Sequence, residues 1–120
     1  MQTGLSQEDW PEELDALAAA PKHHALLLEN ETVRVLDTRV APGDTVPLHT
    51  HRWPSALYIM SWSDFVRRDC DGAVLVDSRA GEKLPVGGAF WSEPLEPHTL
   101  ENVGQSELRA ISVEVKGGGR

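Results

Sequence analysis

The sequence predicts an all-β protein, a sandwich or barrel of antiparallel strands preceded by one short helix. Three observations support this fold class. The chain has 120 residues, which suits a single domain. From Ala25 onward, short runs rich in Val, Thr, Ile and aromatic residues alternate with turns that contain Gly, Pro and Asp. Before that point, an acidic segment that contains two prolines has the composition of a helix.

The segment 6–22, SQEDWPEELDALAAAPK, predicts this helix. Pro11 suits a first turn, acidic residues occupy the N-terminal end, and Pro21 ends the helix. The apolar positions that share one face are Trp10, Leu14, Leu17 and Ala18. This spacing favours a helix that packs on the outside of a larger body or exchanges with a partner subunit. We therefore assign residues 1–24 to an N-terminal helical extension.

The barrel itself is expected within residues 25–116. Its predicted strands are 32–40, 46–50, 57–61, 65–69, 73–77, 89–92, 98–102 and 108–115. The pair Asp71-Gly72 between two of them is typical of a tight hairpin, because Gly accepts the positive φ that such a turn requires. Residues 117–120, of sequence GGGR, are expected to form a flexible tail.

Composition excludes several partners. The 19 acidic residues against 11 basic ones give a net charge of −8, which repels nucleic acid. The apolar runs 16–20 and 25–28 fall short of the roughly 20 residues that cross a bilayer, so we expect no membrane partner. The first residues lack the features of a signal peptide, and the single cysteine, Cys70, cannot form an internal disulfide. These features predict a cytoplasmic location.

The five histidines fall into two groups. We interpret His23 and His24, in a polar segment after the helix, as solvated. His49 and His51 are two residues apart on a predicted strand, so both side chains point to the same side of the sheet. His98 lies on a distant strand. The pattern is compatible with a metal site, and also with core histidines that only form hydrogen bonds.

Two motifs resemble those of the cupin superfamily. The first, a Gly, five residues and then His-x-His, is matched by GDTVPLHTH starting at Gly43. The second is matched by Gly81, a Pro-Val-Gly, and PHTLEN, which contains His98 and Asn102; the gap before this histidine is longer than in the family. The resemblance covers residues 26–115. It implies a small antiparallel double-stranded β-helix, commonly a homodimer, with a metal near the wide end of the barrel.

The ligands that the resemblance implies for a divalent transition metal are His49, His51 and His98. In the family a Glu four or five residues after the second histidine completes the ligand set, but here those positions hold Ser55 and Ala56. Tyr58, taken as the aromatic residue that usually follows this Glu by three, makes Ser55 its counterpart. Neutral imidazoles leave the charge of the metal uncompensated, which favours hydroxide or an anionic substrate as a further ligand.

The reaction stays open at this point. The metal could be Fe, Zn, Ni or Mn. Three-histidine sites without the Glu occur among cupin thiol dioxygenases and diketone-cleaving dioxygenases. The leading interpretation is therefore a dioxygenase-like enzyme that acts on a small polar or anionic metabolite. Hydrolysis or isomerisation by a metal-activated hydroxide is equally compatible. The alternative is a non-catalytic ligand-binding module or a degenerate cupin.

Further side chains are candidates for the pocket. They are Ser55, Trp53, Trp91, Asn102, Glu93 and Glu96. The two tryptophans could form an apolar wall or belong to the core. Glu93 and Glu96 could replace the lost carboxylate, act as a general base or lie on the surface. One arginine turned inward could bind a substrate carboxylate, and the candidates are Arg34, Arg39, Arg67, Arg79 and Arg109.

Overall fold

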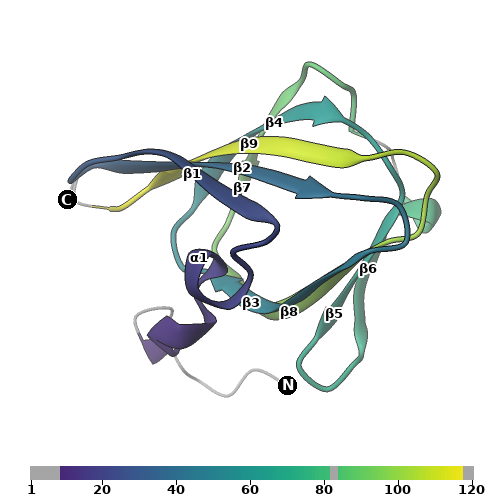
Figure 1. The fold of residues 1–120 in the computed structure, drawn as a ribbon, viewed down its shortest axis with the longest axis horizontal. Helices are drawn as coiled ribbons and strands as arrows, with labels where there is room; N and C mark the ends of the chain where they lie inside the picture. The colour runs from purple at the N-terminus through teal and green to yellow at the C-terminus, as the bar shows by residue number, and fades with distance from the viewer. Residues whose placement is uncertain (1–8, 82–83, 118–120) are drawn as a thin grey trace.

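The computed structural model describes residues 9–81 and 84–117, which form two antiparallel sheets around one interior (Figure 1). The larger sheet has the strand order β1-β2-β9-β4-β7, and the smaller has the order β3-β8-β5-β6. The strands are His24–Glu29 (β1), Val33–Val40 (β2), Thr45–His51 (β3), Ser55–Ser61 (β4), Phe65–Asp69 (β5), Val74–Asp77 (β6), Ala89–Ser92 (β7), Leu95–Asn102 (β8) and Leu108–Val115 (β9). The predicted all-β fold with a short N-terminal helix is confirmed.

All eight predicted strands are present, with ends within three residues of those expected. The ninth, β1, was not predicted. It is an edge strand that pairs with β2, and its residues after His24 are exposed. The run from Ala25 to Leu28 is continuously apolar, so it lacks the alternation that identifies a half-buried strand. One consequence is that His24 belongs to a sheet and not to a polar loop.

The N-terminal helix is shorter than predicted. It consists of a 3-10 turn, Glu12–Leu14, and one turn of α-helix, Ala16–Ala19 (α1). Asp15 separates them, because its backbone is extended, with a ψ of 146°, and forms a β-bridge with Thr50. The expected apolar face is confirmed only in part: Trp10, Leu14 and Leu17 are half-buried, but Ala18 is exposed, and the fully buried residues here are Ala16 and Ala20.

Two local features of the barrel follow from its sequence. The expected hairpin joins β5 and β6, with Gly72 at a φ of +88°. A small apolar core of buried Ala20, Val40 and Val46 is completed by Leu100 and Leu108. No helix among the described residues has the length and apolarity that crossing a membrane requires. Of the expected tail, residues 118–120 lie outside the described part of the chain.

Candidate metal centre

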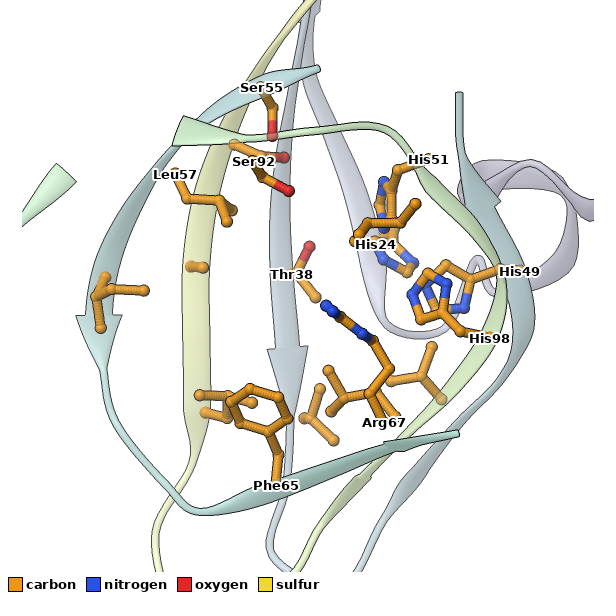
Figure 2. Close-up of a pocket in the computed structure, with 18 of the residues that line it drawn as sticks. His24, Thr38, His49, His51, Ser55, Leu57, Phe65, Arg67, Ser92 and His98 are labelled. Carbon is orange, nitrogen blue, oxygen red and sulfur yellow. The ribbon is translucent and has the colours of Figure 1, made fainter. Parts of the chain in front are cut away.

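Strand pairing brings the two histidine motifs together. In the ladder between β3 and β8, His49 lies directly opposite His98, and the centroids of their rings are 4.3 Å apart. His51 follows on the same strand, and its ring lies 5.0 Å from that of His49 and 5.9 Å from that of His98. The three residues that the resemblance implied as ligands therefore line one end of the interior (Figure 2).

A fourth histidine joins this cluster. His24 pairs with Thr38 across β1 and β2, and both line the interior. Its ring lies 5.0 Å from that of His49 and 5.3 Å from that of His51 (Figure 2). One ligand atom from each of His24, His49 and His51 lies within 4.8 Å of the other two, so these three are close enough to be candidate ligands of one metal ion. We call the four residues His24, His49, His51 and His98 the histidine cluster.

The interpretation of His23 and His24 as solvated is wrong. The two residues are 6% and 4% exposed. They point in different directions, because Nε2 of His23 lies 2.9 Å from Oδ2 of Asp44, whereas His24 faces the barrel interior. The sequence signal that could have identified His24 was its place at the start of the apolar run that forms β1.

All four histidines of the cluster present the same nitrogen to the interior. In each ring, Nδ1 donates to an acceptor behind the ring. The acceptor is a backbone carbonyl oxygen for three of them: that of Ala20 for His24 at 3.0 Å, that of Pro47 for His49 at 2.7 Å and that of Glu96 for His98 at 2.6 Å. For His51 it is the carboxylate of Glu114 at 2.9 Å. Because these oxygens only accept hydrogen bonds, Nδ1 carries the proton in each ring. Nε2 is then left with a lone pair, as a metal ligand requires.

Burial keeps these imidazoles neutral. It lowers the pKa of His49 to about 2, with further contributions from the nearby rings of His98 and His51. Burial likewise lowers the pKa of His98 to about 3 and that of His24 to about 4. These three histidines are therefore neutral at any pH near 7, which is the protonation state that a metal ligand requires.

Behind the cluster lies a charge network that the sequence did not predict; it is buried at Glu114 and Arg34 and half-buried at Asp15. Glu114 is 0% exposed. Its Oε2 accepts a hydrogen bond from Nδ1 of His51, and its Oε1 accepts a hydrogen bond of 2.6 Å from Nε of Arg34. Arg34 in turn donates two hydrogen bonds of 2.9 Å to Asp15. Burial acts to raise the pKa of Glu114, but the hydrogen bonds from His51 and Arg34 outweigh it and leave the pKa below its usual value. This carboxylate is therefore ionised and fixes the orientation of His51.

The position at which the cupin motif carries a Glu holds a neutral group in this chain. Ser55 is buried, lies opposite Ser92 of β7, and both line the interior (Figure 2). Neither Glu93 nor Glu96 supplies a carboxylate. Glu93 accepts a hydrogen bond from the indole of Trp91 at 2.9 Å, and Glu96 offers its backbone carbonyl to His98.

The other expected pocket residues do not line the interior. Trp91 is 58% exposed, because Ser92 takes the inward position on β7. Trp53 lies beyond the end of β3 and packs under the cations of Arg34, Arg52 and Lys116. Asn102 is buried but serves the fold, because its amide donates to the carbonyls of Val40 and Ser106 and accepts from Ser63.

The histidine cluster opens into a cavity of about 160 Å³. Most of its remaining lining is apolar, including Leu57, Ile59, Phe65, Leu95, Leu100 and Leu108. Hydroxyl groups enter at Thr38, Ser55, Ser92 and Ser112, and Arg67 projects from β5 (Figure 2). The arrangement can hold a small molecule between a polar end of four imidazoles and an apolar wall.

Comparison with known proteins identifies the fold. No family model and no curated protein matches the sequence. Among solved structures, a cupin domain from Bordetella pertussis is similar, with a TM-score of 0.63, 19% identity, and coverage of 78% of this chain and 92% of that one. A double-stranded β-helix protein from Klebsiella pneumoniae has a TM-score of 0.56, 17% identity and coverage of 100% and 95%. The polyketide cyclase RemF from Streptomyces resistomycificus has a TM-score of 0.53, 18% identity and coverage of 96% and 80%.

Proposed function

We propose that this chain, which has the cupin fold, is a metal-dependent enzyme that acts on a small polar or anionic metabolite inside its barrel. The observation that carries the proposal is the common orientation of the histidine cluster, in which every Nδ1 is bonded behind its ring. A purely structural role would not require four imidazoles, from three strands, to converge on one end of a cavity.

The geometry is close to that of a metal site. Two nitrogens bound to one ion at about 2.1 Å can be at most about 4.2 Å apart. The ligand atoms of His24, His49 and His51 lie within 4.8 Å of one another, so closing the site requires shifts of roughly an ångström. His98, opposite His49 in the ladder, is the fourth proposed ligand. A divalent metal held by these neutral groups would act as a Lewis acid toward a bound carbonyl or activate water or dioxygen.

The surrounding residues have distinct roles in this proposal. Glu114 holds the proton of His51 on Nδ1 and so keeps Nε2 available to the metal. The hydroxyl groups of Thr38 and Ser55 offer hydrogen bonds to polar groups of the substrate. Leu57 and Phe65 belong to the apolar wall, which excludes water from the reacting end.

Oxygenase chemistry is the first reaction class to test. The protein is loaded with Fe²⁺ and mixed with a panel of thiols and 1,3-diketones, while oxygen consumption and substrate loss are followed. We expect uptake of oxygen with at least one class, loss of this activity in His49→Ala, and retention in His23→Ala, which changes a buried histidine outside the cluster. Binding of a panel member without turnover would favour the non-catalytic module, and the absence of both would contradict the proposal.

A non-oxidative reaction of the same site is the second candidate. It rests on the absence of a carboxylate among the proposed ligands, because a metal held by imidazoles alone favours hydroxide as a further ligand. The same diketones are therefore tested with Zn²⁺-loaded protein. Loss of diketone without oxygen uptake would support this candidate, and a requirement for both Fe²⁺ and oxygen would exclude it.

A further inference from the structure

We propose that Arg67 binds the carboxylate of the ligand, so that the cavity accepts a small organic acid with an apolar body. The inference deepens the proposed function and rests on it in one respect, because the ligand is a substrate only if the protein is an enzyme. The binding of the carboxylate itself requires no metal, and this separates the two claims experimentally.

The placement of Arg67 follows from the register of the smaller sheet. Arg67 of β5 lies opposite Leu100 of β8, and both side chains line the cavity. His98 is two residues from Leu100 on the same face of β8, so Arg67 and His98 are diagonal neighbours. Figure 2 shows the guanidinium directed from its strand into the interior of the barrel.

Arg67 has no acidic partner, unlike five of the other six arginines within residues 9–81 and 84–117; the sixth, Arg52, donates to the backbone carbonyl of Trp10. The ion pairs of the others include Arg34 with Asp15 and Glu114, Arg39 and Arg109 with Asp37, Arg68 with Glu101, and Arg79 with Asp77. Within residues 9–81 and 84–117, no hydrogen bond or ion pair holds the Arg67 guanidinium. A half-buried cation without a partner has lost part of its hydration, and an anionic ligand would offset this cost.

The charge around Arg67 favours an anion. The described residues that line the cavity include no Asp or Glu. The charge of Glu96 attracts Arg67 from outside the cavity, because both residues line a neighbouring pocket. The Glu96 carboxylate nevertheless lies too far from the guanidinium to form an ion pair. Burial lowers the pKa of Arg67, and the charge of Glu96 opposes this effect, but a guanidinium remains protonated in either case. The interior therefore carries a positive charge that nothing in its lining neutralises.

The shape of the cavity defines the rest of the ligand. Its volume of about 160 Å³ is close to that of an engineered protein cavity that binds benzene, so the enclosed part of a ligand has roughly six to ten non-hydrogen atoms. A planar guanidinium pairs with a carboxylate through two parallel hydrogen bonds. The leucine and phenylalanine lining suits a hydrocarbon or aromatic body.

The test uses benzoate, with uncharged benzamide as its isostere, titrated calorimetrically into the full chain after metal removal. We expect benzoate to bind at least tenfold more tightly than benzamide. Arg67→Met should weaken benzoate binding at least tenfold and leave benzamide binding unchanged. Arg68→Met is the matched control, because Arg68 is the next residue on β5, pairs with Glu101 and does not line the cavity; its benzoate affinity should equal that of the wild type.

Three results would overturn the proposal: no benzoate binding at 20 mM, equal affinity for benzoate and benzamide, or wild-type affinity in Arg67→Met. Circular dichroism and the Zn²⁺ affinity of Arg67→Met check that the variant is folded. Because the titration is made without metal, its failure leaves the metal site of the proposed function intact. Conversely, a protein that binds benzoate through Arg67 but no metal would refute only the proposed function.

Discussion

Glu114 is the residue through which the charge network and the histidine cluster are connected. It lies on β9, opposite Arg34 of β2. On β9 it shares the inward face with Ser112 and Ala110. The alternation of β9 could have placed this side chain inside the barrel from the sequence. The sequence could not show that it would meet His51, because that contact depends on how the sheets pack.

Replacing Glu114 tests its role as the partner of His51. Glu114→Gln removes the charge that stabilises the Nδ1 proton, so metal affinity should fall about 10- to 100-fold. It also leaves Arg34 with Asp15 alone, and the free energy of unfolding should drop by about 3 kcal/mol. Competition with a chromogenic zinc chelator measures the metal affinity, and urea denaturation measures the free energy of unfolding. Glu101→Gln, which changes a partly exposed acid paired with Arg68, should leave the metal affinity unchanged.

His24 and His23 form a natural pair of variants, because the neighbours face in different directions. His24→Ala removes a proposed ligand and should lower zinc affinity at least tenfold. His23→Ala removes the contact with Asp44 and should leave zinc affinity unchanged. Equal zinc affinities for His24→Ala and the wild type, in variants that circular dichroism shows to be folded, would remove His24 from the ligand set.

Among the elements, the edge strand and the helix show where local sequence fails as a guide. The eight predicted strands were identifiable because each is a short run bounded by turn residues. The strand β1 was missed because its apolar residues do not alternate, and its partner β2 stabilises it through pairing that the local sequence does not encode. The helix was overestimated because Asp15 joins a bridge with Thr50 and pairs with Arg34 in place of continuing the helix. In each case a tertiary contact outweighs local propensity.

Asp15 holds α1 against the barrel. Its carboxylate accepts a hydrogen bond of 3.1 Å from the backbone N–H of Leu17 and one from each terminal nitrogen of the Arg34 guanidinium. Asp15→Ala loses the helix cap and half of the charge network, so we expect the free energy of unfolding to fall by about 2 kcal/mol in urea denaturation. Glu13→Ala, at an exposed position of the preceding turn, serves as the control. Equal denaturation midpoints for the two variants would show that Asp15 does not anchor the helix.

For the whole molecule, the neutral histidines make the stability of the metal-free protein depend on pH. His24, His49 and His98 have pKa values of about 4, 2 and 3, whereas the unfolded chain protonates its histidines near pH 6.5. The unfolded state therefore binds more protons, and acid favours it. Each of these histidines contributes stability that is complete above pH 6.5 and decreases as the pH falls toward the folded value.

The expected loss at pH 5 is about 2 kcal/mol for each of these histidines. Urea denaturation of metal-free protein between pH 5 and 7 measures it, in a range above the lowered pKa values of Asp15, Asp37, Asp44 and Asp77. His98→Gln should reduce the slope by about 1.4 kcal/mol per pH unit, the contribution of one proton. A wild-type stability that does not change across this range would contradict the burial of neutral imidazoles.

Two expectations for the whole molecule stay predictions. The homodimer was implied by resemblance to the cupin superfamily, and a single chain does not test it. The cytoplasmic location likewise stays a prediction. At this scale the sequence motifs were informative about the fold, because Gly43 lies at the turn into β3 and His49 and His51 lie at the other end of the same strand.

The metal content of the protein tests the central claim most directly. Untagged protein, purified without chelators, is dialysed against Fe²⁺, Zn²⁺, Ni²⁺ or Mn²⁺ and analysed by inductively coupled plasma mass spectrometry. The account predicts roughly one equivalent of at least one of these metals per chain, lost in His49→Ala. A folded wild-type protein that retains none of the four metals would contradict it.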